Sequence, residues 1–135
     1  MKKFLRIRSV KSILLLFVAL SFTSCSFVYE LLVQNLGKNK VELIFSPILS
    51  SSDINNKTPE TVYNKNMEAY KITLNPAETI KIGNVQNKEQ PEAASIDIDY
   101  LEIRSSSDTI IFNNKNSILA ALQKVDKYDW RILIK

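Results

Sequence analysis

Apolar and polar side chains alternate with a period of two over short stretches of this chain, beginning near residue 29. Segments 29–34 and 41–46 both show this alternation, and the run Asn-Leu-Gly-Lys-Asn at positions 35–39 separates them. Alternation on both sides of a turn rich in Gly and Asn is typical of a β-hairpin. The two segments are therefore predicted to be paired antiparallel strands.

The same pattern predicts further strands downstream. They span residues 69–74, 78–82, 96–104, 108–112 and 128–134. Pro76 lies between the first two of these segments, and its fixed φ favours a tight turn there. Within 96–104 the apolar positions shift phase after Tyr100, which indicates either a β-bulge or two half-buried faces.

One helix is predicted before the last strand, because Ile118, Leu122 and Val125 recur at helical spacing in an alanine-rich run. Asn116 or Ser117 is expected to cap it. Many short strands with one late helix favour an antiparallel sandwich. We expect an all-β fold: a single antiparallel immunoglobulin-like β-sandwich of about seven strands, with one short helix before the last strand. The aromatic residues expected in its core are Tyr29, Phe45, Tyr70, Tyr100 and Trp130.

Residues 47–67 form a polar segment rich in Ser and Asn, longer than a usual hairpin loop. Two interpretations stay open. The segment is a loop that contributes to a partner-binding surface, with Tyr63 as its anchor. Alternatively, it conceals a short strand, for which Thr61-Val62-Tyr63 is the candidate.

The first 24 residues follow a different pattern. Five basic residues precede the first long apolar run, residues 13–20, and no acidic residue occurs before Glu30. The run is shorter than the roughly 20 apolar residues that span a bilayer. It has the length of the hydrophobic region of a secretory signal. Residues 1–24 are therefore predicted to be a cleaved signal peptide.

Phe22, Thr23 and Ser24 precede Cys25, the only cysteine of the chain. This arrangement resembles a lipobox, where lipoprotein signal peptidase recognises small residues before a cysteine whose thiol carries diacylglycerol. The resemblance implies recognition at residues 22–24, lipidation of Cys25 and a lipid-anchored β-sandwich domain over residues 25–135. Each buried methylene contributes roughly 0.8 kcal/mol, so one acyl chain binds a membrane only marginally, whereas the two or more chains of a lipoprotein hold the domain there stably. An ordinary secretory signal with an unmodified cysteine is the alternative.

Removal of this segment changes the net charge. The whole chain has 18 basic and 14 acidic residues. Without the five leading basic residues, 13 basic and 14 acidic residues remain from Cys25 onward. The mature protein is therefore close to neutral, and we expect no nucleic-acid partner.

Three short motifs resemble small envelope lipoproteins of the Bacteroidota that have an immunoglobulin-like β-sandwich. They are Tyr-x-Leu-x-Val-x-Asn at 29–35, Leu-Asn-Pro-Ala-Glu at 74–78 and Trp-x-Ile at 130–132, and the Phe-Thr-Ser-Cys lipobox is similar to theirs. The resemblance implies an outer-membrane lipoprotein, with which Ser26 agrees because an aspartate there tends to retain lipoproteins at the inner membrane. Residues 26–29 carry no acidic cluster of the kind that marks surface export, which favours the periplasmic face. The resemblance brings no functional residues.

The side chains used most often in catalysis are missing. The chain has no histidine, and its one cysteine is assigned to lipid, which removes the commonest general base, metal ligand and thiol nucleophile. We interpret the serine runs at 50–52 and 105–107 as loops. Asp97 and Asp99 are expected on one face of a strand with Glu102 nearby. A solvated strand face explains them, and a calcium site or sugar contact is the alternative.

The expected function is therefore that of a non-enzymatic binding or accessory module, without metal or cofactor, held at the membrane by its N-terminal lipid. Its partner is expected to be an envelope protein or a glycan. Two alternatives stay open: a structural or stress-related envelope protein, and an inhibitor of an envelope-acting enzyme.

Overall fold

The computed structural model describes residues 27–64, 66–86 and 90–135. The predicted signal peptide and the lipobox residues Phe22, Thr23, Ser24 and Cys25 lie outside these ranges. The described elements are β1 (Val28–Asn35), β2 (Val41–Ser46), β3 (Glu60–Asn64), β4 (Met67–Leu74), β5 (Thr79–Gln86), the 3₁₀-helix η1 (Ala93–Ser95), β6 (Tyr100–Arg104), β7 (Thr109–Phe112), α2 (Lys115–Ala121), β8 (Gln123–Asp126) and β9 (Asp129–Ile134).

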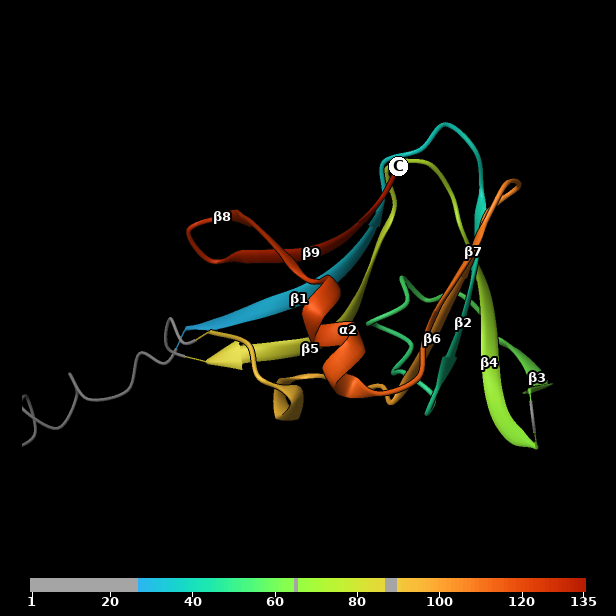
Figure 1. The fold of residues 1–135 in the computed structure, drawn as a ribbon, viewed down its shortest axis with the longest axis horizontal. Coiled ribbons are helices and arrows are strands. Elements are labelled where there is room, and N and C mark those ends of the chain that lie inside the picture. The colour runs from blue at the N-terminus through green and yellow to red at the C-terminus, as the bar shows by residue number, and fades with distance from the viewer. Residues whose placement is uncertain (1–26, 65, 87–89) are drawn as a thin grey trace, which may run out of the picture.

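The described strands form two sheets, so the predicted all-β class is confirmed (Figure 1). The four-stranded sheet has the order β5-β1-β9-β8, and the five-stranded sheet has the order β3-β4-β2-β6-β7. The described part of the chain thus has nine strands rather than about seven. The two additional strands are β3, which the sequence left open, and β8, which it did not indicate.

The predicted pairing of the first two strands is wrong. β1 pairs with β5 and β9, whereas β2 pairs with β4 and β6 in the other sheet. The connection through residues 36–40 therefore crosses from one sheet to the other. Asn35 holds this crossing in place, because its buried side-chain amide donates hydrogen bonds to the carbonyls of Asn39 at 2.8 Å and Leu74 at 3.2 Å.

The expectation of purely antiparallel strands is also incorrect at one ladder. β1 and β9 run parallel, with Leu31 opposite Trp130 and Val33 opposite Ile132. Almost the whole described chain separates these two strands, so no local turn dictates their relative direction. Every other ladder in the described sheets is antiparallel.

One apolar core fills the space between the inner faces of the two sheets. Its strand residues include Leu31 and Val33 of β1, Leu43 and Phe45 of β2, Ile80 and Ile82 of β5, Leu101 and Ile103 of β6, and Ile132 and Ile134 of β9. Full burial of one such side chain contributes about 1.5–3 kcal/mol. Of the predicted core aromatics, Phe45 is fully buried, and Tyr70 and Trp130 pack at the margin of the core. Tyr100 lies in a separate small cluster with Ile44 and Ala69, and Tyr29 lies outside both clusters, so its predicted core position is wrong.

Two apolar side chains anchor the segment after β2 to the core, although most of its described residues are exposed. Leu49 and Ile54 are 6% and 1% exposed and belong to the core, and residues 60–64 form the edge strand β3. The second interpretation of this segment, a concealed strand, is therefore confirmed.

The strand predicted over residues 96–104 is shorter than expected, because only Tyr100–Arg104 form β6. Ile96 bridges to Gly83 of β5, and the Asp99 N–H donates to the Ser46 carbonyl in the other sheet at 2.7 Å. This segment therefore crosses between the sheets. Gly83 permits the crossing, because a Cβ there would lie 2.0 Å from the carbonyl oxygen of Ser95.

Helix α2 also begins and ends earlier than predicted. Its N-cap is Asn114, whose side chain accepts a hydrogen bond from the Ser117 N–H at 2.9 Å, and neither Asn116 nor Ser117 is the cap. Ile118 is fully buried, whereas Val125 lies exposed in β8. Val125 follows Ile118 and Leu122 at helical spacing, but the segment that contains it, β8, pairs with β9 instead.

Candidate functional site

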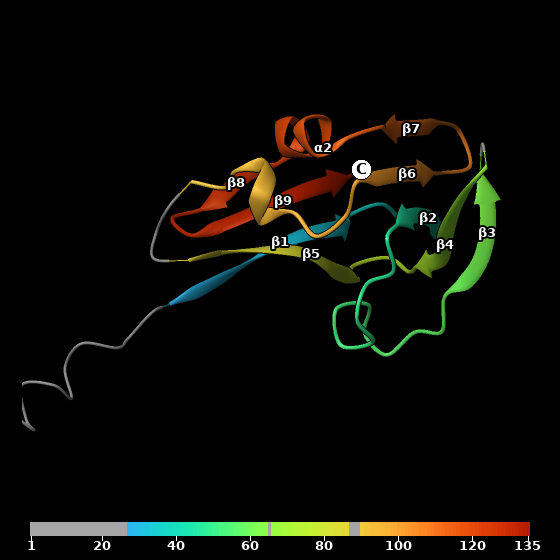
Figure 2. The same cartoon turned by 90° about the horizontal axis from the view of Figure 1, so that it is seen from below.

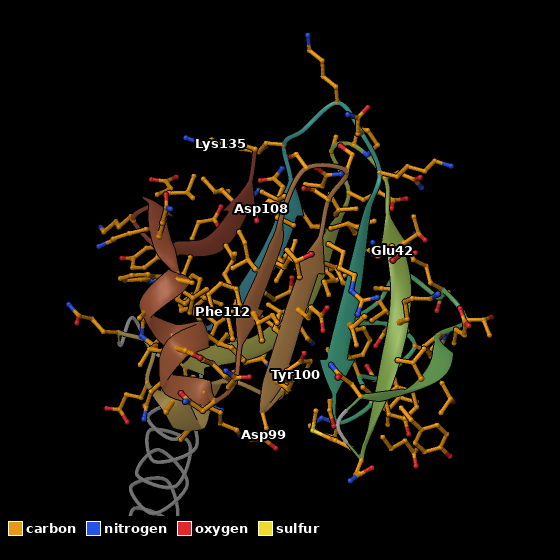
Figure 3. All side chains as sticks on the ribbon, turned by 45° about the vertical axis from the view of Figure 1, so that its right-hand side comes forward. Glu42, Asp99, Tyr100, Asp108, Phe112 and Lys135 are labelled. Atoms are coloured by element: carbon orange, nitrogen blue, oxygen red, sulfur yellow. The ribbon has the colours of Figure 1, made fainter. Side chains whose placement is uncertain are left out.

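A cleft of about 380 Å³ opens between β7 of one sheet and β9 of the other. Its apolar lining consists of Ile103, Ile110, Phe112, Ala121, Ile132, Leu133 and Ile134. Its polar rim consists of Ser105, Ser107, Asp108, Gln123 and Lys135. Asp108, Phe112 and Lys135 are labelled along this opening in Figure 3. The cleft has both apolar and polar lining residues, which suits a ligand that carries apolar side chains beside polar groups.

Strand register places the apolar side chains of β7 in this cleft. Ile110 pairs with Ile103, and Phe112 pairs with Leu101, so both β7 residues share the inner face of β6. Ile111 pairs with Glu102 and therefore lies on the outer face. Ile110 and Ile111 are 46% and 44% exposed, so β7 presents a large apolar side chain on each face of the sheet.

Helix α2 follows β7 and packs against the core at this edge. It connects β7 to β8, as Figure 2 shows, and its Ile118 side chain is fully buried in the core. Leu119 and Ala121 pack against the same core, and Leu122 follows the helix as its C-cap. Because the chain continues into this helix and then into β8 of the other sheet, no described strand pairs with the outer edge of β7.

β7 is an edge strand that pairs, among the described residues, with β6 alone. In an antiparallel ladder every second residue directs its N–H and C=O away from the partner strand. β7 therefore offers backbone donors and acceptors at the mouth of the cleft. Its sequence, Thr-Ile-Ile-Phe, contains no charged residue and no proline, the usual devices that protect a sheet edge.

The other described sheet edges carry such protection. The outer edge of β5 is covered, because the Lys81 N–H donates to Asp53 at 2.9 Å and the Asp97 N–H donates to Ile82 at 2.8 Å. β8 carries Lys124 and Asp126, and β3 carries Glu60. The unprotected apolar edge is thus specific to β7 within the described residues.

A buried polar cluster lies on the outer face of the five-stranded sheet. Glu102, 3% exposed, accepts hydrogen bonds from Tyr100 at 2.5 Å, Arg104 at 2.5 Å and Asn64 at 3.1 Å. Burial, with the hydrogen bond to Glu102, raises the pKa of Tyr100 to about 12, so its phenol stays protonated at neutral pH. Asn64 also donates to the Tyr100 hydroxyl at 2.8 Å, which ties the β3–β4 hairpin to β6.

The predicted acidic group does not assemble. Asp97 and Asp99 precede β6 and are not buried, whereas Glu102 is buried in it. The Asp99 carboxylate lies 3.7 Å from the ammonium of Lys115. Among residues 27–64, 66–86 and 90–135, no three His, Cys, Asp or Glu side chains are grouped so as to hold a metal ion.

The serine runs lie in turns, as predicted. In the first, the Ser50 hydroxyl donates to the Asp53 carboxylate at 2.5 Å, and that carboxylate also contacts Lys81 at 2.6 Å. Burial raises the pKa of Asp53, but the hydrogen bonds from Lys81 and Ser50 outweigh it and lower the pKa overall. In the second, the Ser105 hydroxyl accepts the Asp108 N–H at 3.0 Å. Both runs stabilise turns, and Ser105 and Asp108 also line the cleft.

The structure separates Tyr63 from the cleft. Tyr63 is 80% exposed on β3, at the opposite edge of the five-stranded sheet from β7. Its role as a partner anchor stays a prediction, as do the roles of the lipobox residues outside the described ranges. Sequence reasoning missed Ile110 and Ile111 as site residues. Consecutive apolar residues in a strand that follows a serine turn were the available signal.

No family model, curated protein or solved structure matches this chain. In the described part of the chain, no helix has the length and apolar character needed to cross a bilayer.

Proposed function

We propose that this chain is an outer-membrane lipoprotein whose domain binds an extended segment of another envelope protein through the edge of β7. In this proposal residues 1–24 are a cleaved signal peptide and Cys25 carries the lipid that holds the domain at the periplasmic face. The domain acts as a non-enzymatic accessory module. Its fold is assigned to the immunoglobulin-like β-sandwiches, because two largely antiparallel sheets enclose one core in about a hundred residues.

The observation that carries the binding role is the coincidence of an unprotected strand edge with a partly apolar cleft. An added strand would continue the five-stranded sheet beyond β7 and satisfy its outward backbone groups. Alternate side chains of that strand would then enter the cleft beside Ile110 and Phe112. Main-chain hydrogen bonds supply affinity in this mode of recognition, and the cleft supplies selectivity.

The chemistry of the cleft defines the partner segment. β7 has four residues, so the partner needs a short extended stretch of similar length. Every second residue of this stretch should be apolar, to match Ile110, Phe112 and Ile132 in the cleft. Asp108 and Lys135 also line the cleft and suit polar residues beside that stretch.

Photo-crosslinking in the native cell tests this proposal. A photo-crosslinking amino acid replaces Ile111, which lies on β7 but outside the cleft, and a second strain carries it at Tyr63 on β3. We expect a protein adduct from position 111 that disappears in the Ile110→Lys background, because a charge at the edge opposes strand addition. The matched control is Thr61→Lys on the β3 edge, which should leave the adduct unchanged.

Two results would contradict the binding role. The first is an adduct from position 63 with none from position 111, which would transfer the partner surface to β3. The second is an adduct at 111 that survives Ile110→Lys. The anchor is tested separately by fractionating cells that express Cys25→Ala, which should lose membrane retention.

A further inference from the structure

Aromatic rings and lysines gather at the end of the domain where β1 begins. Tyr29 of β1 stacks on Tyr128, with ring centroids 4.6 Å apart and planes inclined by 20°. The ammonium of Lys127 lies 5.2 Å from the ring centroid of Tyr128, and that of Lys124 lies 5.9 Å from that of Trp130. These five residues are called the aromatic end surface below.

Exposed apolar side chains surround the aromatic end surface. Phe27 and Val28 at the start of β1 are 60% and 54% exposed, and Val125 in the β8–β9 hairpin is 51% exposed. Figure 1 shows the β8–β9 turn beside the start of β1, at the end of the molecule where the described chain begins. An apolar, aromatic and basic surface of this kind differs from the ordinary polar surface of a soluble domain.

Two ammonium groups lie over the rings themselves. Asp129 is paired with Arg131, with 2.5 Å between a carboxylate oxygen and Nη2. Asp126 accepts a hydrogen bond from the main-chain N–H of Lys127 and so belongs to the turn. Asp126 and Glu30 are also exposed, so Lys124 and Lys127 supply positive charge at the ring faces and not over the whole end of the domain.

The chain length between the lipid site and this surface is very short. Phe27 follows Cys25 by two residues, which span at most roughly 7 Å when extended. The headgroup layer of one leaflet is about 5–8 Å thick. If Cys25 carries acyl chains, Phe27 and the start of β1 are necessarily held at the headgroup layer.

We infer that the aromatic end surface binds the phospholipid headgroup layer of the membrane that holds the lipid anchor. Tyrosine and tryptophan rings prefer this layer because one part of the ring is apolar and the other is polar. Lysines beside them contact anionic headgroups. This inference rests on the proposed lipidation of Cys25, and it adds a second contact that orients the domain.

Such an orientation exposes the binding cleft. Lys135 and the β6–β7 turn at Asp108 line the cleft, and Figure 1 shows the C-terminus and that turn away from the β8–β9 turn. With the aromatic end surface on the membrane, the β7 edge stands clear of the headgroups. A partner segment in the aqueous compartment then reaches it without crossing the lipid surface.

Energy transfer from Trp130, the only tryptophan of the chain, measures this contact. The mature lipidated protein is reconstituted in vesicles of phosphatidylethanolamine and phosphatidylglycerol that contain a dansyl-labelled headgroup. The test variant is Lys124→Glu with Lys127→Glu. The control is Lys38→Glu with Lys40→Glu, the same charge change on exposed residues beyond the other end of β1.

We expect the test variant to lower the energy transfer by about two-fold or more, because it replaces attraction to anionic headgroups with repulsion. The control should match the wild type, and added salt should lower the wild-type transfer. Flotation of the vesicles is measured in parallel. Thermal unfolding checks that both variants remain folded at the temperature of the assay, since the test variant loses only two contacts between exposed lysines and rings.

Flotation separates the two possible failures. If all proteins float and the test variant transfers energy as the wild type does, the headgroup contact is refuted while the anchor stands. If the wild type does not float, the lipid anchor is refuted and the headgroup contact falls with it. A photo-crosslink from position 125 to a protein instead of to lipid would assign this end to a protein partner and overturn the inference.

Discussion

The side-chain amide of Asn35, at the end of β1, donates a hydrogen bond of 3.2 Å to the main-chain carbonyl of Leu74 at the end of β4. The same side chain accepts from the Gly37 N–H at 2.9 Å, and the Asn35 carbonyl accepts from the Ala77 N–H at 2.7 Å. One fully buried asparagine thus joins the two connections, β1–β2 and β4–β5, that pass from one sheet to the other. A buried polar residue with all these partners is a stabilising element of the fold.

Asn35→Ala should therefore lower the free energy of unfolding by about 2–4 kcal/mol, because the buried carbonyls it serves lose their donor. Urea unfolding followed by circular dichroism measures this change. The matched control is Asn39→Ala, because Asn39 takes part through its main-chain carbonyl, which the substitution retains. Equal effects of the two substitutions would contradict the assigned role of Asn35.

Tyr100→Phe removes the hydroxyl that donates to Glu102 in the buried cluster. We expect a loss of about 1–3 kcal/mol in unfolding free energy, since a buried carboxylate loses a charge-assisted partner. Tyr63→Phe removes an exposed hydroxyl and should change stability by less than about 0.5 kcal/mol. The comparison is made by urea unfolding at neutral pH, where the Tyr100 phenol is protonated. If Tyr100→Phe left the free energy of unfolding unchanged, the stabilising role assigned to the hydrogen bond between Tyr100 and Glu102 would be wrong.

The lowered pKa of Glu78 predicts that the folded protein loses stability in acid. The Asn75 N–H, the Lys57 ammonium and the Asn75 side chain stabilise its carboxylate and lower its pKa from 4.5 to about 2. Because the folded pKa is lowered, this stabilisation is complete above about pH 4.5 and is lost as the pH falls towards 2. Glu78→Gln should cost about 1 kcal/mol at pH 7, after allowance for solvent screening of a partly exposed group.

The measurement is urea unfolding of wild type and Glu78→Gln between pH 7 and pH 2. The difference between them should shrink steadily below about pH 4.5. Glu30→Gln, at an exposed position, is the control and should follow the wild type at every pH. A Glu78→Gln difference that stays constant across this range would refute the assigned ionisation.

Gly83→Ala should destabilise the fold by about 3 kcal/mol, because the new Cβ would meet the main chain of Ser95 and displace the crossing segment. Gly37→Ala is the control. Its Cβ would lie 3.1 Å from the side-chain oxygen of Asn35, a contact that a shift of a few tenths of an ångström relieves, so its cost should be clearly smaller than that of Gly83→Ala. Thermal unfolding of the two variants compares them. A tolerated Gly83→Ala would mean that residues 93–97 do not lie against β5.

Asn114→Ala removes the N-cap of α2 and should cost about 1 kcal/mol. Asn116→Ala changes the residue that the sequence suggested as a cap, but in the structure it lies inside the helix and is exposed. This second substitution should be neutral or stabilise by up to about 0.7 kcal/mol, because alanine has the better helix propensity. Urea unfolding of both variants identifies the cap, and a larger loss in Asn116→Ala would reverse the assignment.

Alternation of apolar residues predicted β2 correctly and most of β1, because one face of each strand is buried in the core. β3 and β8 gave little or no such signal. All four residues of β8 are exposed, and β3 has one apolar residue among its partly buried positions. An edge strand with both faces near solvent has no need for an apolar series, so the periodicity used for prediction is missing.

The candidate site was predictable only in part. The apolar run at 110–112 is visible in the sequence, and it was assigned to a strand. That this strand lies at a sheet edge depends on the pairing of β6 with β2 and on the position of α2. Asp97 and Asp99 were predicted to lie on one face of a strand near Glu102. This prediction was wrong, because the segment that contains them crosses between the sheets.

The sequence by itself determined the all-β class, the buried faces of the central strands and the positions of the serine turns, because these depend on neighbouring residues along the chain. The tertiary structure alone decided that β1 and β2 lie in different sheets, that β9 runs parallel to β1 and that β7 is left open. These features depend on which distant segments meet. Contacts such as those of Asn35 with Leu74 and of Gly83 with Ser95 select among pairings that satisfy the same alternating pattern equally well.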